Sequence, residues 1–460
     1  MKTLAKTGVT RELARYVVEL DVRSLSEATV EHAKQALLDL IGIAVRASAT
    51  TVISASVRRA VTTLDSEGTA TAVGYGPRFA PQYAALLNGC NFHVLDFDDT
   101  HERSSLHPGA PVIGAALTAA EQTRGSGRAL IAAIVAGYDV IVRVGLAALP
   151  AVHYARGFHP TATAGIFGAT AAVARLHRDS AELLESAFGI NLSQSAGSLQ
   201  FSVDGAQTKP LHVGLTAHNA ILARAFAAAG VTGPAEALEG RSGFLHAYSD
   251  GATAAGVLDD WDGVHEIDRT AFKPYPCCRY MHSAIDVLSK IVRERGVTPE
   301  SVERIRVSLP AAGMRLCAYP EEHKRKPQSL VDAQFSMYYA AAATVLRGSV
   351  RWDDYAQRSD PAIASLIERV VVCEDPGVEA LFPRMAALVE IDAGALHERR
   401  LSATPRGEPD DPLGWDDIIA KFNDLTGMVY DAARRERIID TIRRLEKVDD
   451  IRTLTAELGA

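Results

Sequence analysis

The stretch Ala129–Ala147, ALIAAIVAGYDVIVRVGLA, decides the fold class of this chain. Apolar residues lie on nearly every side of a helix drawn through it, which is typical of a helix buried on most sides. The uninterrupted apolar run is only about ten residues long before Asp139 and Arg143 interrupt it, whereas a bilayer requires roughly 20. We therefore expect a core helix and no membrane anchor.

The segments on either side of this stretch have the same composition. Ala, Gly, Ile and Val fill 110–121, 161–175 and 214–229, and 27–47 has apolar residues at three- and four-residue steps. Small residues such as Gly165 and Gly168 permit close approach of two helix backbones, at a cost near 1 kcal/mol per glycine in helix propensity. The sequence up to about residue 267 therefore predicts tightly packed helices.

The pattern changes near Asp268. Runs of β-branched or alternating residues predict strands at 302–309, 367–373 and 386–391, and helical patterns occupy 283–295 and 332–346. The stretch 268–404 therefore predicts an α+β unit. After a polar loop at 403–414, helical patterns return at 415–423 and 429–445. From pattern alone, this tail either caps the α+β unit or returns to the first domain.

Composition excludes several classes of protein. The 460 residues carry a net charge of −8 and are 47% hydrophobic, so disorder is excluded and there is no electrostatic reason to bind nucleic acid. Five cysteines, none at CxxC spacing, do not form a closed disulfide framework or a standard zinc site. The N-terminus lacks the apolar run of a secretory signal. We expect a reduced, cytoplasmic protein.

Five clusters rich in polar residues interrupt the apolar pattern, at 88–109, 156–163, 204–214, 272–282 and 325–336. The first has carboxylates and histidines for a metal site or an acid/base site, although HExxH and facial-triad spacings are absent. A solvated acidic loop is the competing interpretation. Its candidate residues are His93, Asp96, Asp98, Asp99, His101, Glu102 and His107.

The other clusters allow both functional and structural interpretations. His159-Pro160 precedes an apolar run, so it suits a helix start with N–H groups free for an anion. Lys209 stands in front of another apolar helix, and Lys273 and Arg279 flank prolines that extend the backbone between domains. Each of these side chains could equally be structural or solvated. GxGxxG, GxxxxGKS/T and GxSxG motifs are absent, which removes the usual support for nucleotide binding and serine hydrolysis.

Together these clusters resemble the MmgE/PrpD family of 2-methylcitrate dehydratases, cis-aconitate decarboxylases and iminodisuccinate epimerases. The resemblance implies an all-helical domain formed by 1–267 and 405–460, an α+β lid at 268–404, and a homodimer without metal or organic cofactor. The matching stretches are NGCNFHVLDFDDT (88–100), HPG (107–109), GFHPTATAGIFGA (157–169), DGAQTKPLHVG (204–214), KPYPCCRYMH (273–282) and KPQSLVDAQFS (326–336).

The resemblance also implies roles for individual residues. Compared with the decarboxylases, this chain has one more residue between Thr100 and His107 and a different segment after Lys273. Cys278, Arg279 and His282 in that segment are expected to contact substrate. The positions that match active-site residues of cis-aconitate decarboxylases are Asp96, Thr100, His107, His159, Lys209 and Lys273.

These residues suit chemistry next to a carboxylate. Removing a proton or CO₂ there builds negative charge, which needs fixed cations and a proton carrier with a pKa near neutral. We expect a cofactor-independent lyase acting on a small di- or tricarboxylate, with a dehydratase favoured over an epimerase or isomerase and then a decarboxylase. The alternative from another class is a non-catalytic dimer that binds a carboxylate, although such a protein would not need two histidines, His107 and His159, as proton carriers.

Overall fold

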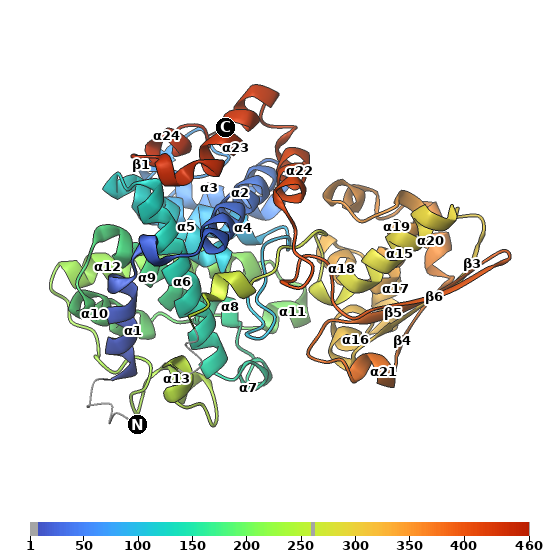
Figure 1. Ribbon diagram of the computed structural model, residues 1–460, viewed down its shortest axis with the longest axis horizontal. Coiled ribbons are helices and arrows are strands. Elements are labelled where there is room, and N and C mark those ends of the chain that lie inside the picture. The colour runs from blue at the N-terminus through green and yellow to red at the C-terminus, as the bar shows by residue number, and fades with distance from the viewer. Residues whose placement is uncertain (1–7, 259–262, 460) are drawn as a thin grey trace. The chain divides into compact units, whose positions relative to one another are not determined.

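The computed structural model describes residues 8–258 and 263–459 and divides the chain into two compact units. Unit 1 contains Met1–Val94, Asp98–Thr270 and Gly414–Ala460, and unit 2 contains Leu95–Phe97 and Ala271–Leu413. Unit 1 is mainly helical and unit 2 combines helices with a four-stranded sheet (Figure 1). The chain is thus a mainly α protein with a smaller α+β part.

The division between the units differs from the predicted boundaries at 267/268 and 404/405. Residues 266–270 stay with unit 1, where the Glu266 N–H donates to Asp139 at 2.7 Å. Residues 405–413 stay with unit 2, where the Phe272 N–H donates to Gly407 O at 3.2 Å. Both boundaries between the units thus follow hydrogen bonds between residues distant in sequence. A change in local composition gives no information on such bonds.

Unit 1 is a stack of helices with a short two-stranded hairpin. The C-terminal α22 packs on α2, where Lys421 forms an ion pair with buried Asp39 at 2.7 Å (Figure 1). Its elements are α1 (Val9–Glu19), α2 (Glu27–Thr50), α3 (Val52–Thr62), β1 (Glu67–Thr71), β2 (Arg78–Phe79), α4 (Pro81–His93), α5 (Gly109–Thr123), α6 (Gly127–Ala147), α7 (Pro150–Ala155), α8 (Pro160–Thr163), α9 (Gly165–His177), α10 (Ala181–Leu192), α11 (Gln200–Asp204), α12 (Thr208–Ala228), α13 (Phe244–Tyr248), α14 (Ala255–Leu258), the 3₁₀ turn η2 (Glu266–Arg269), α22 (Trp415–Thr426), α23 (Ala432–Arg443) and α24 (Arg452–Thr455).

Helix α6 contains the apolar stretch Ala129–Ala147. It is long and apolar enough to cross a membrane. α2 and α3 reach that length and apolarity only as a pair, and an 82° bend separates them. Within unit 1, however, 89% of the most apolar window of α6 is buried, and α6 packs on α5 and α9. This burial is typical of the core helix of a globular unit.

Glycines allow the close helix packing on which the site depends. A Cβ added at Gly214 of α12 would lie 2.6 Å from Leu86 O of α4, and one added at Gly168 of α9 would lie 2.6 Å from Gly137 O of α6. Backbone atoms cannot move aside as side chains can, so both positions require glycine. The expected close approach at Gly168 is confirmed, and the contact at Gly214 brings the first turns of α12 against α4.

Unit 2 contains a mixed sheet in the order β4-β3-β5-β6. β3 pairs parallel to β4 and antiparallel to β5, and α15 and α19 pack on the sheet. The apolar residues of β3 and β5 contribute to one buried core with these helices. Its elements are the 3₁₀ turn η3 (Arg279–Met281), α15 (His282–Arg295), β3 (Val302–Leu309), α16 (Ala311–Cys317), α17 (Glu321–Arg325), α18 (Leu330–Gln334), α19 (Met337–Arg347), α20 (Pro361–Ile367), β4 (Val370–Glu374), α21 (Pro376–Glu379), β5 (Ala387–Ala393) and β6 (Leu396–Ser402).

Several features differ from the predicted elements. The helix predicted at 332–346 is interrupted at Phe335 and Ser336, so that α18 ends at Gln334 and α19 begins at Met337. The expected strand at 367–373 begins only at Val370, because Ile367 ends α20. The edge strand β6, LHERRLS, is too polar to give a strand pattern, and its residues alternate between half-buried and exposed. α12 begins at Thr208, six residues earlier than expected, so Lys209 lies within the first helical turn rather than in front of it.

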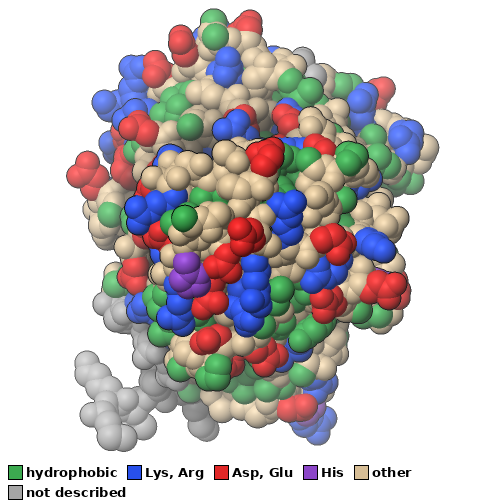
Figure 2. All heavy atoms as spheres, turned by 90° about the vertical axis from the view of Figure 1, so that its right-hand side faces the viewer, with side chains coloured by type: hydrophobic (Ala, Val, Ile, Leu, Met, Phe, Trp, Pro, Cys, Tyr) green, Lys and Arg blue, Asp and Glu red, His purple; other side chains and the backbone are tan. Residues whose placement is uncertain are grey.

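The face of the molecule drawn in Figure 2 mixes positively and negatively charged side chains. Exposed ion pairs in unit 2 include Arg295 with Glu398 at 2.8 Å and Arg399 with Glu390 at 2.9 Å. This face thus lacks the single-sign patch that nucleic acid binding requires.

Candidate active site

Four histidines of unit 1 gather around one buried carboxylate, and we call this set the histidine cluster: His93, His107, His159, His212 and Asp98. The ring of His93 lies 4.8 Å from that of His107 and 5.8 Å from that of His159, and His159 lies 5.7 Å from His212. Four separate segments supply them. His93 ends α4, His107 precedes α5, His159 caps α8, and His212 lies in α12.

Asp98 connects two of these rings. Its Oδ2 atom lies 2.7 Å from His93 Nδ1, a hydrogen bond, and 3.4 Å from His107 Nδ1, within ion-pair range. Burial alone would raise the pKa of Asp98, but the neighbouring His93 and His107 outweigh it and hold that pKa well below the usual range. Asp98 is therefore an ionised carboxylate that orients both imidazoles, as the carboxylate does in a catalytic Asp-His pair.

The environment keeps two of the histidines neutral. Burial, with the charge of Lys209 contributing, lowers the pKa of His93 to about 4. Burial also lowers the pKa of His159 well below its usual range, and the charge of Lys209 contributes. Neutral imidazoles can accept a proton at physiological pH. Lys209 adds a cation close enough to affect both rings.

A second buried carboxylate, Asp99, anchors the turn that carries His107. Tyr138 OH donates to Asp99 Oδ2 at 2.7 Å, and the Gly109 N–H donates to Oδ1 at 3.2 Å. Burial and the charge of Asp98 raise the pKa of Asp99 to about 8. The His107 N–H in turn donates to Thr161 Oγ1 at 3.2 Å. These bonds fix the backbone of residues 107–109 against α6 and α8.

Several buried polar atoms at the histidine cluster lack a hydrogen-bond partner among the described residues. They are His93 Nε2, Asp98 Oδ1, His159 Nδ1, His212 Nδ1 and the nearby Thr100 Oγ1. Buried polar atoms in folded proteins are nearly always paired with protein, water or ligand, so a concentration of unpaired ones indicates a site for a polar ligand. Substrate contact by Thr100 remains a prediction.

His93, Asp98 and His107 could also hold a metal ion, because their ligand atoms lie within 4.8 Å of one another. Tetrahedral zinc with bonds near 2.1 Å would hold its ligand atoms about 3.4 Å apart. His93 Nδ1 and Asp98 Oδ2 are closer than this, at 2.7 Å, the distance of a shared proton. We therefore interpret the set as a proton relay, and the absence of a cofactor remains a prediction.

A second group of predicted residues lies in unit 2 around Lys273. Lys273 is only 1% exposed, and its Nζ donates to Asp96 O at 2.9 Å and lies 3.3 Å from Asp96 Oδ1. Gln334 holds the same segment through a 2.7 Å bond to Leu95 O. Asp96 therefore contacts Lys273, whereas the sequence groups it with the histidines of the first polar cluster.

Arg279 and His282 form a network close to Lys273. Arg279 Nη2 donates to Glu408 at 2.8 Å, and its Nη1 lies 3.0 Å from His282 Nδ1. Burial and the charges of Arg279 and Lys273 hold the pKa of His282 well below its usual range. Glu408 neutralises Arg279, so the geometry favours a role for Arg279 in orienting His282 over direct substrate contact.

The cysteines of this segment are buried, and all five cysteines of the chain are free. The pKa of Cys278 is lowered by a hydrogen bond with Cys317, whereas burial raises the pKa of Cys277 well above its usual value. Cys277 and Cys278 are thus two small buried side chains. Cys278 as a substrate contact remains a prediction.

The structure thus places the predicted residues in two groups. Unit 1 brings His107, His159 and Lys209 together, and unit 2 brings Asp96 and Lys273 together. Sequence reasoning did not assign roles to His93, Asp98 or His212, although His93 and Asp98 lie in the first polar cluster. For His93 and Asp98 the available signal is that Asp98 follows, by five residues, the histidine that ends an apolar helix. Only the loop geometry shows that the two side chains form a hydrogen bond.

Comparison with known proteins gives matches over nearly the whole chain. Residues 11–256 match the MmgE/PrpD N-terminal domain and residues 275–447 the MmgE/PrpD C-terminal domain. The cis-aconitate decarboxylase-like protein oryM of Aspergillus oryzae is 28% identical over 98% of this chain and 97% of its own length. Cis-aconitate decarboxylase of Mus musculus is 27% identical over 97% of this chain and 93% of its own, and that of Aspergillus terreus 24% over 98% and 96%.

Proposed function

Because the chain belongs to the MmgE/PrpD family of carboxylate-processing enzymes, we propose that it is a cofactor-independent lyase that decarboxylates a small tricarboxylate such as cis-aconitate. The observation that carries the proposal is the histidine cluster, with its ionised Asp98, its neutral imidazoles and the adjacent cation Lys209. The sequence analysis favoured a dehydratase; the full-length similarity to decarboxylases moves decarboxylation ahead of it.

The cluster has the parts that this reaction needs. When CO₂ leaves, the electron pair of the broken carbon–carbon bond stays on the substrate and spreads toward a neighbouring carboxylate. Lys209 supplies fixed positive charge for such a carboxylate. A protonated histidine then delivers a proton to carbon. His107 suits this step, because its Nδ1 lies 3.4 Å from Asp98, which can orient the imidazole.

Dehydration remains the second candidate function, because two imidazoles share one carboxylate. His93 and His107 both contact Asp98 Oδ2, so one could remove a proton from carbon while a second histidine protonates the leaving hydroxyl. Such a reaction needs a base and an acid, whereas decarboxylation needs only proton delivery.

Turnover in heavy water separates these reactions. With cis-aconitate, a decarboxylase releases CO₂ and places deuterium only in the product. With 2-methylcitrate, a dehydratase exchanges the substrate hydrogen next to the carboxylate when proton removal is reversible. If neither substrate reacts and neither binds, the chain does not carry out this family's chemistry on these acids.

Substitutions then test the roles of the residues. His107→Gln and His159→Gln should each lower kcat by roughly 10²–10⁴-fold, the usual contribution of a general acid or base. Lys209→Met should mainly raise KM. The control is His246→Gln, which replaces an exposed histidine of α13. Near-full turnover in both His107→Gln and His159→Gln would move the proton chemistry to other residues.

A further inference from the structure

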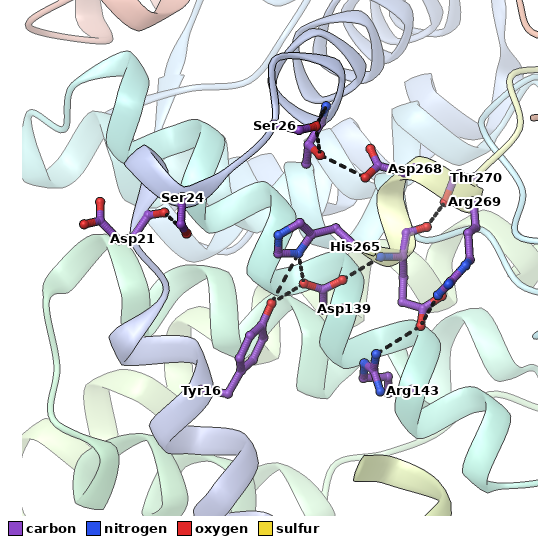
Figure 3. Close-up of polar contacts among 12 residues, drawn as sticks. Tyr16, Asp21, Ser24, Ser26, Asp139, Arg143, His265, Asp268, Arg269 and Thr270 are labelled. Atoms are coloured by element: carbon purple, nitrogen blue, oxygen red, sulfur yellow. Dashed lines mark hydrogen bonds and ion pairs between the residues drawn. The ribbon is translucent and has the colours of Figure 1, made fainter. Parts of the chain in front are cut away.

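A polar cavity lies within unit 1, and it is lined by different residues from those of the histidine cluster. Its volume is about 230 Å³, and its charged lining residues are Arg103, Arg143, Arg269 and Glu266. Glu266 Oε1 lies 3.4 Å from Arg143 and 3.4 Å from Arg269, which approach it from α6 and from η2 (Figure 3). Arg103 lies in the loop between Asp98 and Pro108 and is exposed.

The charge of this lining is positive. Three guanidinium groups face one carboxylate, and the C-terminal end of α6 adds only about half a negative charge. The nearby acids have other partners. Asp139 accepts from Tyr16, from the Glu266 N–H and from His265 (Figure 3), Asp268 accepts from Thr29, and Asp250 pairs with Arg156. Among the charged residues that line the cavity, three arginines and one glutamate, positive charge therefore predominates.

Another part of the lining is apolar, and we call it the apolar wall. Leu146, Ala147 and Leu149, at and just after the end of α6, form it together with Thr253 and Gly256. The volume lies below the ~300–1,000 Å³ of pockets for drug-sized ligands, so only a small molecule fits. An anion with a short hydrocarbon chain matches both kinds of lining residue, since its charges can meet the arginines and its methylene groups the leucines. We propose that this cavity binds a small dicarboxylate.

The cavity is connected to the histidine cluster through one loop. Residues 98–108 supply Asp98 and His107 to the cluster and Arg103 to the cavity. In the same loop, His101 Nε2 lies 3.5 Å from Glu266 Oε2, and the loop closes on itself where the His101 N–H donates to Leu106 O at 2.9 Å. A ligand that pairs with Arg103 and Arg269 therefore orders the loop that carries His107. The site is regulatory, and it does not depend on which reaction the histidine cluster performs.

Calorimetric titration of the full-length protein with succinate tests binding. The variants are Arg103→Gln and Arg269→Gln, and the control is Arg59→Gln, an exposed arginine of α3. Lys209→Met reports binding at the histidine cluster separately. Succinate should bind wild type, Arg59→Gln and Lys209→Met alike, and at least tenfold more weakly to the double variant Arg103→Gln/Arg269→Gln. Equal binding by that double variant and wild type would overturn the proposal.

Inorganic phosphate at matched ionic strength tests the apolar wall, because it offers charge without methylene groups. Succinate should bind at least tenfold more tightly, and equal affinities would overturn the assignment to a dicarboxylate. Hydrogen–deuterium exchange gives a readout independent of turnover. Succinate should slow exchange in residues 98–108 and 266–269 of wild type but not of the double variant. Unchanged exchange in wild type at saturating succinate would overturn the proposed ordering of the loop.

Discussion

His93 makes the stability of the protein depend on pH. Folding lowers its pKa from about 6.5 to about 4, mainly through burial, so between these values the unfolded chain binds more protons than the folded one. The free energy of unfolding should therefore fall as the pH drops from 6.5 to 4, with this residue contributing about 3 kcal/mol. Urea unfolding of wild type and His93→Gln across this range measures the contribution. Parallel pH dependences in the two proteins would contradict it.

Asp99 acts in the opposite direction. Burial raises the pKa of Asp99 to about 8, so between pH 4 and 8 the folded protein holds a proton that the unfolded chain releases. The contribution of Asp99 to the free energy of unfolding therefore falls as the pH rises. Asp99→Asn removes the charge and keeps one acceptor oxygen for the Gly109 N–H, while its NH2 group can donate to the Tyr138 oxygen. It should gain stability relative to wild type from pH 5 to pH 8 by more than about 1 kcal/mol. Asp250→Asn, at an exposed acid, is the control and should show no such gain.

At the scale of elements, the start of α5 is the most constrained part of the site. A Cβ added at Gly109 would lie 2.5 Å from Asp99 Oδ1, 2.5 Å from Tyr138 OH and 2.9 Å from Leu40 Cδ1. Gly109→Ala must therefore displace the anchor of the His107 turn, and we expect a loss of about 1–3 kcal/mol in stability together with reduced kcat. Gly76→Ala is the matched control, because an added Cβ there meets no atom within 4 Å. Thermal unfolding and turnover of both variants check this.

At the scale of the whole molecule, the proposed chemistry requires only side chains. Dialysis against a strong chelator should leave turnover unchanged, since His93, Asp98 and His107 act as a proton relay. Loss of activity that a divalent ion restores would show instead that these three residues hold a metal. Elemental analysis of the purified protein before and after dialysis shows whether an ion was removed.

The homodimer implied by the family resemblance is also a prediction for the whole molecule. Light scattering coupled to gel filtration should give twice the chain mass of 49.2 kDa. A mass equal to one chain at micromolar concentration would contradict it.

The sequence by itself determined the class of fold and most of the helices. The composition of Ala129–Ala147 indicates a helix buried on all sides. The spacing of apolar residues, with a period of 3.6 in helices and 2 in strands, distinguishes the helices from strands such as Val302–Leu309. The sequence also determined the family, because each polar cluster is a short continuous stretch that can be recognised without the structure. The sequence did not predict the polar edge strand β6, because its pairing with β5 rather than its own apolar residues holds it in place.

Only the tertiary structure decided which polar residues act together. Asp96 and Asp98 stand two positions apart with the same chemistry, yet one contacts Lys273 and the other His93. The partner of each carboxylate depends on the backbone turn between them, where Asp96 has a φ of +52°. The cavity at Arg143 is likewise invisible in sequence, because Arg103, Arg143 and Arg269 come from three segments that only helix packing brings together.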